Sequence, residues 1–507
     1  MKHLKTKTLT LGLLAALGMA SCGGGGGANL AGIGGTGIVA VGQITGFGSV
    51  FVNGVEYFLK NDSQLLVNNT PVGQSNLKLG MVVTISGTLD NSGQATINKL
   101  VYDAEVRGPI GAAITTGADL QTKTLDIMGK TIIVDAVGTS FSGNYSFDGI
   151  TQNDLVEVSG FIIDGNGTIQ ATHIERHSVF SGSDTVEIKG RLSSFVLNSS
   201  TSFLLDNNIT VSFDPNGGTD MSSLGTCGLG QGCYLEIEGL YDPANNTINA
   251  SKIEAAASAL PESSDEAEIE GVITDFVSLG NFKINGIKID ASSATLEPSS
   301  LTLANGSAVE VEGSLAGGTL LAENITGRGG DIEIEAYVVG TPTNNIVKLQ
   351  ITDNQTIDVV VNDSQTRMED ETGAATSTMK FADIADNNFL EIKATQDNSG
   401  NIVATTLKRK NGDDGEVILQ GPLDVNSLQF NGTVTLNILG VAFSSNSSTE
   451  FQEDDGSDTD PMIDINTFFS ALTEISGSVV VKIKDKIPGG TGITLGDGIA
   501  DEMEIKL

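Results

Sequence analysis

The feature that most constrains the fold is an internal repeat, because the same ordered landmarks recur in six windows along the chain. The first landmark is a small residue that opens a strand of alternating apolar and polar residues. These openers follow one another at intervals of 66, 82, 81, 65 and 85 residues, and they are Gly42, Gly108, Gly190, Gly271, Ala336 and Gly421. Self-similarity at this period indicates that one small unit was copied along the chain.

Two further landmarks follow each opener. The second is an alternating strand that closes on a small residue in five windows, at Gly87, Gly160, Gly239, Gly313 and Ala394, and reads VVVKIKD in the sixth. The third is Ala-x-x-apolar on the next strand, at Ala171/Ile174, Ala250/Ile253, Ala322/Ile325, Ala404/Leu407 and Ala500/Met503, with Ile97/Leu100 in the first window. Alternation places Val309 and Val311 on one face of its strand and Glu310 and Glu312 on the other.

Each window has the same internal order of elements. An opening strand precedes a hairpin with a turn such as Asn285-Gly286, whose residues readily adopt positive φ angles. A short helical piece, the second landmark and the third landmark follow. Five strands with this helical piece between the third and fourth are typical of an OB-type barrel. The sequence therefore predicts an all-β protein of about six tandem five-stranded barrels, with a bend or bulge at the glycine of the second landmark.

The landmarks also divide the chain. We expect barrels at residues 39–104, 105–182, 183–256, 268–330, 331–412 and 413–507. The Ala- and acid-rich stretch Ala255–Glu268 predicts a linker at residues 257–267 that separates three barrels from three. Adjacent barrels are expected to pack side by side, since the intervals leave little room for other linkers.

The N-terminus is typical of an export signal. Three lysines precede an apolar run, Leu9–Ala20, which is too short for a stable membrane span. The run ends in Met19-Ala20-Ser21-Cys22, which resembles the lipobox of bacterial lipoproteins. We therefore expect a signal peptide over residues 1–21, a lipidated Cys22, and a Gly-rich tether over residues 22–38. The alternative is an ordinary secreted protein in which Cys22 is incidental.

Charge limits the partners of the chain. It has 63 Asp and Glu against 27 Lys and Arg, for a net charge of −36. Signal cleavage would remove three lysines and no acids, which gives 24 − 63 = −39. Nucleic-acid binding depends on Lys and Arg that displace counterions from phosphates, so it is not expected. No later segment approaches 18 uninterrupted apolar residues, so the lipid is the expected membrane contact.

Three segments carry a family resemblance: GQITGFGSVFVNGVEY from Gly42, the turn Leu77-x-x-Gly80, and GVITDF with KINGIKI after Gly271. They resemble a bacterial family of tandem-repeat lipoproteins described as domain of unknown function five-six-six-six. The resemblance implies an OB-like module on a lipidated chain. By analogy with lipoprotein sorting, Gly23 after the cysteine favours the outer membrane. The family supplies no activity and no catalytic residues.

Cys227 and Cys233 would be the cysteines left beside the lipidated one. In an exported protein, two cysteines this close predict a local disulfide. A redox or metal-binding pair is the alternative, although five intervening residues do not match the Cys-x-x-Cys spacing of redox sites.

Two histidines and several acidic clusters are the candidate metal ligands. His173 and His177 lie on a predicted strand, where a four-residue spacing separates them by about 13 Å, so a solvated strand end is favoured over a zinc site. The densest acidic cluster could supply the oxygens that calcium prefers, and it comprises Glu453, Asp454, Asp455, Asp458, Asp460 and Asp464. A solvated acidic loop is the alternative there. It is favoured more strongly for two smaller clusters, Asp413, Asp414 and Glu416, and Glu369, Asp370 and Glu371.

No catalytic pattern is visible. The chain has no Gly-x-Ser-x-Gly elbow, and its Gly-rich stretches lack the lysine of a phosphate-binding loop. The leading hypothesis is a non-enzymatic, lipid-anchored envelope protein without a cofactor, which has a structural role or binds protein, polysaccharide or cations. A calcium-dependent surface adhesin or matrix component is the first alternative, and an envelope enzyme is the second.

Overall fold

The computed structural model describes residues 37–89, 94–117, 121–195, 201–224, 229–256, 260–261, 263–297, 301–328, 332–373, 377–397, 399–411, 416–453, 461–474, 479–486 and 496–506. These residues form 37 strands, one α-helix and three 3₁₀ helices, so the predicted all-β class is confirmed. No described helix is long and apolar enough to cross a membrane.

The first three windows, here named repeats 1 to 3, contain β1 to β17. Repeat 1 has β1 (Ile38–Phe47), β2 (Val50–Val52), β3 (Val55–Val67), β4 (Thr70–Pro71), η1 (Gln74–Asn76), β5 (Val82–Leu89) and β6 (Ala95–Tyr102). Repeat 2 has β7 (Val106–Thr116), β8 (Thr122–Ile127), β9 (Lys130–Asp135), β10 (Ser140–Ser142), β11 (Asp154–Ile162) and β12 (Ile169–Val179). Repeat 3 has β13 (Thr185–Phe195), β14 (Ser202–Leu205), β15 (Ile209–Ser212), β16 (Tyr234–Asp242) and β17 (Thr247–Ala255).

The remaining windows, repeats 4 to 6, contain β18 to β37. Repeat 4 has β18 (Ser263–Ser278), β19 (Asn281–Ile284), β20 (Ile287–Asp290), β21 (Thr295–Glu297), β22 (Ala308–Ala316) and β23 (Thr319–Gly327). Repeat 5 has β24 (Ile332–Val338), β25 (Ile346–Thr352), β26 (Gln355–Val360), β27 (Arg367–Asp370), β28 (Ser377–Thr378), η2 (Phe381–Asp383), β29 (Phe389–Gln396) and β30 (Ile402–Lys410). Repeat 6 has β31 (Glu416–Pro422), η3 (Val425–Ser427), β32 (Gln429–Phe430), β33 (Val434–Ile438), β34 (Val441–Ser444), β35 (Glu450–Glu453), α1 (Ile465–Glu474), β36 (Val480–Lys486) and β37 (Glu502–Lys506).

Strand pairing closes a ring in repeats 1 to 5. In repeat 1 the ring runs β1-β2-β3-β6-β5 and returns to β1, with β3 and β6 parallel. This order, in which the third strand pairs with the fifth, is the OB-type arrangement that the sequence predicts. The apolar face of each strand points into its ring, and Val309 and Val311 are both 0% exposed. Burial of these β-branched side chains therefore holds each barrel closed.

The glycine that ends the second landmark lies at a β-bulge. The register between β11 and β12 shifts at Ser159/Gly160, and the register between β16 and β17 shifts at Glu238/Gly239. A Cβ atom on Gly160 would collide with a backbone carbonyl of the neighbouring strand, so a side chain is excluded. Repeat 5 has the same shift at Lys393/Ala394, where a single methyl group is accommodated.

Repeat 6 departs from the ring pattern. Its strands β32 to β34 form a separate sheet, which two isolated bridges, Leu423–Ile438 and Ser444–Ile499, join to the rest of the barrel. The predicted helical piece is present here as α1, and its Phe468 and Leu472 are buried in the core that repeats 5 and 6 share.

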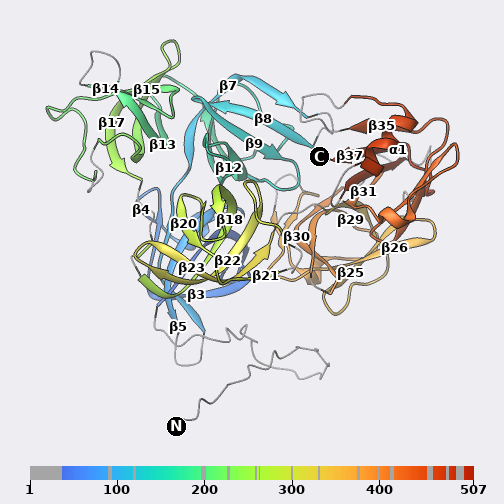
Figure 1. The fold of residues 1–507 in the computed structure, drawn as a ribbon. Coiled ribbons are helices and arrows are strands. Elements are labelled where there is room, and N and C mark those ends of the chain that lie inside the picture. The colour runs from blue at the N-terminus through green and yellow to red at the C-terminus, as the bar shows by residue number, and fades with distance from the viewer. Residues whose placement is uncertain are drawn as a thin grey trace, which may run out of the picture.

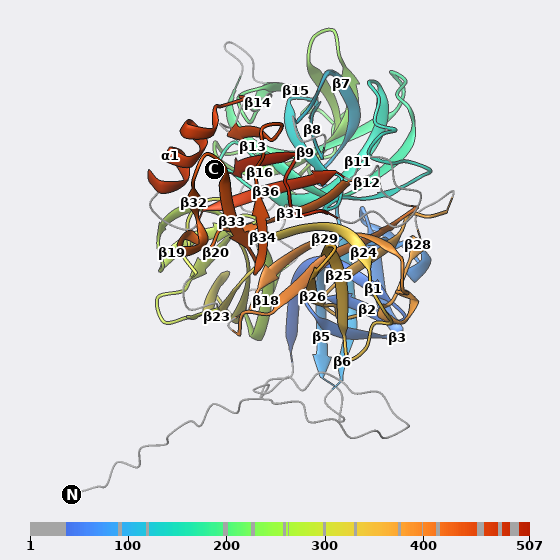
Figure 2. The same cartoon turned by 90° about the vertical axis from the view of Figure 1, so that its right-hand side faces the viewer.

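The six repeats form three pairs rather than a string (Figures 1 and 2). Repeat 1 pairs with repeat 4 through β1 and β18, repeat 2 with repeat 3 through β7 and β13, and repeat 5 with repeat 6 through β24 and β31. The predicted linker at 257–267 is wrong for its second half, because β18 begins at Ser263 and Glu266 pairs with Ile38 of β1. The expected division into two halves is also wrong, since this pairing joins the first repeat to the fourth.

Pairing also covers the polar face of the strands. Glu310, on the face opposite to that of Val309 and Val311, is only 6% exposed. Glu157, Glu236 and Glu268 are likewise buried. The outer face of each barrel is therefore part of an interface that has to satisfy charged side chains.

Candidate functional site

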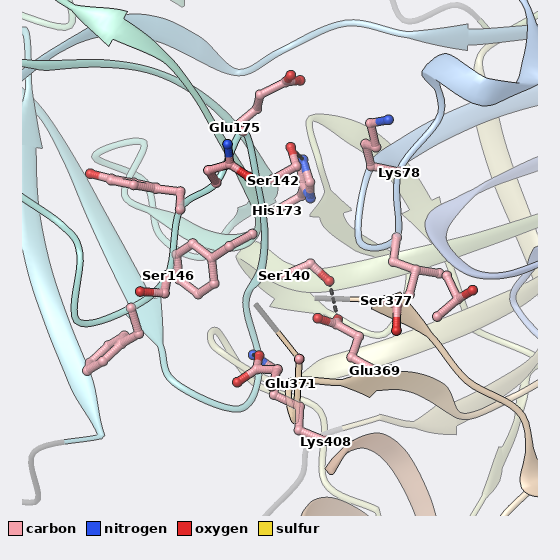
Figure 3. Close-up of a pocket in the computed structure, with 18 of the residues that line it drawn as sticks. Lys78, Ser140, Ser142, Ser146, His173, Glu175, Glu369, Glu371, Ser377 and Lys408 are labelled. Carbon is pink, nitrogen blue, oxygen red and sulfur yellow. Dashed lines mark hydrogen bonds and ion pairs between the residues drawn. The ribbon is translucent and has the colours of Figure 1, made fainter. Parts of the chain in front are cut away.

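A cavity of about 740 Å³ lies where repeats 1, 2 and 5 meet (Figure 3). Repeat 2 contributes the segment that runs from β10 through Asp148, together with part of β12. Repeat 1 contributes the turn after η1, and repeat 5 contributes β27, β28 and the end of β30. The lining residues are Phe47, Leu77, Lys78, Leu79, Ala136, Ser140, Phe141, Ser142, Gly143, Asn144, Tyr145, Ser146, Phe147, Asp148, His173, Glu175, Glu369, Glu371, Gly373, Ser377, Thr378, Lys408 and Lys410.

Aromatic rings are concentrated in one wall of this cavity. Phe141 and Tyr145 lie edge to face, with ring centroids 6.2 Å apart. Phe147 is half-buried, and the Lys123 ammonium lies 4.4 Å from the centre of its ring. The chain has only 25 Phe and Tyr in total (19 + 6) and no Trp, so four aromatic residues in one cavity are a local enrichment.

Asp154 fixes the segment that carries these rings. Its carboxylate accepts hydrogen bonds from the Tyr145 hydroxyl at 2.9 Å, the Thr151 hydroxyl at 2.8 Å and the Arg176 Nε at 2.8 Å. Burial alone would raise the pKa of Asp154, but the Arg176 and Thr151 hydrogen bonds outweigh it and lower the pKa. The carboxylate therefore stays ionised and holds the aromatic wall in place.

Arg367 joins repeat 5 to repeats 1 and 2 beneath the cavity. Its side chain is 0% exposed. The guanidinium donates to Gln43 Oε1 at 2.9 Å and to the carbonyl oxygens of Thr172 at 3.3 Å and Gly138 at 2.6 Å. It also lies 3.2 Å from the Glu369 carboxylate, which is 1% exposed. One planar cation thus connects three barrels through a fixed set of acceptors.

The interpretation of Glu369, Asp370 and Glu371 as a solvated acidic loop is wrong. Glu369 and Asp370 belong to β27, and Glu369 accepts a hydrogen bond from Ser140 of repeat 2 (Figure 3). Glu371 pairs with Lys408 at 3.0 Å. These carboxylates neutralise the cations that repeat 5 directs into the interface, which sequence order alone does not reveal.

Lys408 is the second buried cation of this interface. Its ammonium donates to the carbonyl oxygens of Ala136 at 2.7 Å and Thr139 at 2.8 Å, both in repeat 2. It also lies 5.6 Å from the centre of the Phe141 ring. The loop between β9 and β10 is therefore bound by repeat 5 through its backbone.

The expectation that His173 lies at a solvated strand end is wrong, because it is 1% exposed. It is on a strand, as predicted, and its Nε2 lies 3.1 Å from the Ser142 hydroxyl. Burial lowers the pKa of His173 to about 3, although the Glu157 carboxylate acts in the opposite direction. The imidazole is therefore neutral near pH 7 and is a poor acceptor for the Ser142 proton.

The predicted calcium loop is described only at its edges. Asp454, Asp455, Asp458 and Asp460 lie outside the described residues. Asp464 caps α1, since its carboxylate accepts from the backbone N–H of Asn466 at 2.9 Å and from the Thr467 hydroxyl at 2.7 Å. Glu453 ends β35, with its side chain half-buried. Calcium binding by this loop stays a prediction.

Other predicted site residues are only partly described. Cys22, Cys227, Asp413 and Asp414 lie outside the described residues. Cys233 packs against the core of repeats 2 and 3. Because Cys22 and Cys227 are not described, lipidation and the disulfide stay predictions. Glu416 begins β31 and pairs with Lys486 in register, which places it on a strand rather than in an acidic loop.

The fold and the cavity define a class of protein: tandem OB-type barrels, paired through their opening strands, with a polar cavity at a three-way junction. Three segments, residues 107–175, 270–326 and 348–408, match the sequence profile of the domain of unknown function DUF5666. They fall in repeats 2, 4 and 5, so the expected resemblance to this tandem-repeat family is confirmed.

Comparisons with individual proteins add little. No curated protein sequence matches the chain. Among solved structures, the single-stranded DNA-binding protein of Thermus aquaticus aligns at 10% identity over 35% of this chain and 92% of that chain, with a TM-score of 0.15. A likeness this weak carries no argument about function.

Sequence reasoning missed the cavity because its walls come from distant parts of the chain. Leu79 and Lys408 both line it, yet they are separated by more than three repeats. A local signal was nevertheless present, since the segment Gly143–Asp148 (GNYSFD) combines two aromatic residues with small polar ones. Such a combination is typical of a binding loop.

Proposed function

We propose that this protein is a non-catalytic binding protein of the cell envelope, anchored by a lipidated Cys22, and that its cavity takes a neutral oligosaccharide. The observation that supports the proposal is the lining of the cavity: aromatic rings and neutral hydroxyl and amide groups are brought together at a junction of three barrels. A volume of about 740 Å³ lies in the range of small-molecule sites.

Charge balance supports a neutral ligand. Lys78, Lys408 and Lys410 line the cavity against Asp148, Glu175, Glu369 and Glu371, which leaves 3 − 4 = −1 with neutral His173. The opposite charges of the lining nearly cancel, so the cavity does not favour a strongly charged ligand. A sugar ring presents C–H groups to aromatic faces and hydroxyl groups to Ser, Thr and Asn side chains, which matches this lining.

The groups that line the cavity support a non-catalytic role. The best candidate for a nucleophile and base is Ser142 with His173, and the lowered pKa of His173 disfavours proton transfer at neutral pH. The glutamates Glu369 and Glu371 are engaged by Arg367 and Lys408. Binding therefore needs fewer assumptions than hydrolysis.

Calorimetric titration of the mature chain with neutral and charged oligosaccharides tests the proposal. Phe147→Ala removes a half-buried ring of the cavity wall and should weaken binding at least about tenfold, because full burial of a Phe side chain is worth about 1.5–3 kcal/mol. Phe430→Ala is the matched control, because this ring stacks on Phe469 in repeat 6. Equal affinities of the two variants, or no binding by any oligosaccharide, would refute the proposal.

The lipid anchor has its own test. Cells that express the chain should incorporate labelled palmitate into the wild type and not into Cys22→Ser, and the variant should move from the membrane fraction to the soluble fraction. Retention of the label by Cys22→Ser would exclude this anchor. Protease treatment of intact cells then shows which side of the outer membrane carries the barrels.

A further inference from the structure

A second cluster of ligating side chains lies on the outer face of repeat 2. Glu157 of β11 and Glu175 and His177 of β12 each direct one ligand atom toward the others, and these atoms all lie within 4.8 Å of one another. Glu157 is 4% exposed, and the other two residues are partly accessible. The cluster is therefore open on one side and buried on the other.

Strand register explains how the three side chains meet. Glu157 lies directly opposite Glu175, so two carboxylates share one cross-strand position. A β-bulge follows, because Arg176 pairs with Val156 and Ser178 with Leu155, which leaves His177 as the extra residue. Bulges redirect side chains, and this one brings the His177 Nε2 to 3.5 Å from Glu157.

Three of the five other repeats hold a cation at the position of His177. Arg328 in repeat 4 and Lys410 in repeat 5 stand three residues after the apolar residue of the third landmark, as His177 does in repeat 2. Arg328 pairs with Glu310, and Lys410 pairs with Glu391 at 3.2 Å. Repeat 2 thus places an imidazole where three other repeats place a lysine or an arginine.

The residue directly opposite Glu157 on the neighbouring strand is also not a cation. Opposite Glu391 in repeat 5 stands Lys408, whereas opposite Glu157 stands Glu175. Like charges directly opposite one another destabilise a sheet. Strand pairing places Arg107 of β7 opposite both Glu157 and Glu187, so one guanidinium faces two carboxylates.

A buried hydroxyl from repeat 1 also faces the cluster. Tyr102 is 0% exposed, and its hydroxyl has no partner within normal hydrogen-bonding geometry. Burial raises its pKa, and the Glu157 carboxylate beside it raises it further. Asn68 of the same repeat donates to Glu157 at 2.9 Å, which orients the carboxylate.

We propose that Glu157, Glu175 and His177 form a zinc site at the junction of repeats 1 and 2. One imidazole nitrogen with two carboxylate oxygens matches the ligands of Zn²⁺, whereas Ca²⁺ and Mg²⁺ prefer oxygen alone. The ion supplies the positive charge that Arg328 and Lys410 supply in their repeats. Tyr102 and Asn68 complete the surroundings of Glu157. Glu175 also lines the cavity, but the zinc site is argued from its own three ligand atoms and not from the oligosaccharide proposed for the cavity.

Two other clusters of glutamates in the described residues are already paired with a lysine or an arginine of the protein. Lys252 bridges Glu238 at 3.2 Å and Glu254 at 2.6 Å, and Arg328 binds Glu310. They therefore serve as internal controls rather than as further sites.

The test is calorimetric titration of the mature chain with zinc chloride alone, in excess magnesium to saturate weak carboxylate sites. We expect one tight zinc ion per chain and a rise in melting temperature. His177→Gln and Glu175→Gln should each weaken this binding at least about tenfold. Glu254→Gln, the equivalent of Glu175 in repeat 3, should leave it unchanged.

His177→Arg is the decisive variant, because it restores the residue type found in repeat 4. It should abolish the tight zinc site while its zinc-free form melts no lower than the wild type. Absorption of a bound Co²⁺ probe in the visible range should disappear in the same variant. Unchanged zinc stoichiometry in His177→Arg, or no tight zinc in the wild type, would overturn the proposal.

Discussion

Replacement of Arg367 by methionine should release repeat 5 from repeats 1 and 2. Methionine retains much of the side-chain volume and removes all the donors. The guanidinium contacts Gln43, three backbone carbonyl groups of repeat 2, and Glu369. The change therefore affects a single junction and leaves each barrel core intact.

The magnitude follows from what the substitution leaves behind. Glu369 is 1% exposed and would lose its ion-pair partner at 3.2 Å. Removal of one partner of a buried pair costs about 3–5 kcal/mol, chiefly because the other charge stays buried and unpaired. The double variant Arg367→Met/Glu369→Gln removes that charge, so we expect it to recover at least about half of the loss.

Hydrogen exchange measures this local effect, since a chain of six barrels is not expected to unfold in one step. The reporters are the backbone amides of Val137, Gly138 and Thr139, which are hydrogen-bonded to Asp135 in the loop that Arg367 binds. Their protection should fall by about 100-fold or more in Arg367→Met, which corresponds to about 3 kcal/mol. Amides of repeat 3, such as that of Ile237, provide the control.

Two results would refute this reasoning. One is a loss of protection below about fivefold, equivalent to about 1 kcal/mol, which would show that Arg367 is dispensable. The other is a double variant that exchanges faster than the single one, because the unpaired Glu369 would then not be the source of the cost.

Three further predictions concern single positions. Gly239→Ala should destabilise repeat 3 by about 1–3 kcal/mol in urea titrations, because the new Cβ would collide with the Asn249 carbonyl oxygen, and a Gly182→Ala variant, whose Cβ meets nothing within 4 Å, should cost less. Burial raises the pKa of Asp485 from 3.8 to about 6, so the folded state holds this proton more tightly. The stability that this proton provides is present below the unfolded pKa and is lost as the pH rises through about 6, so the melting temperature of Asp485→Asn should decline less than that of the wild type between about pH 4 and pH 7. Asp464→Ala should destabilise α1 by about 1 kcal/mol, because the helix loses its N-terminal cap. If the heat of calcium binding, measured by calorimetric titration, is unchanged in this variant, Asp464 is not a calcium ligand.

The barrels could be predicted from the sequence because their determinants are local and repeated. Alternating residues such as Val309 and Val311 specify the inner face, and Asn285-Gly286 specifies a tight turn with positive φ at both residues. The bulge at Gly239 was also predictable, since glycine in a strand indicates a close backbone approach. Each signal is read within one unit and does not depend on neighbouring units.

The arrangement of the barrels could not be predicted in the same way. The pairing of β1 with β18 joins segments more than 200 residues apart. Both are opening strands, but all six repeats share that landmark, so it does not select the partner. The sequence predicts His173 at a solvated strand end and Glu369 in a solvated acidic loop, because polar and charged residues usually face water. Burial by a second barrel reverses that expectation.

The residues on the outer faces of the barrels differ between repeats, so they can determine which barrels pair. The same position of the second landmark holds Glu157, Glu236, Glu310 and Glu391 in four repeats, but Lys482 in repeat 6. Lys482 is buried and lies 3.2 Å from Glu333 of repeat 5, so the exception supplies the charge that its partner barrel requires. The inner faces are enclosed within each barrel, so they do not distinguish one partner barrel from another. Selection of the partner therefore depends on these buried charges, and a repeat whose charges remain unmatched, such as repeat 2 at Glu157 and Glu175, is where an added cation is to be sought.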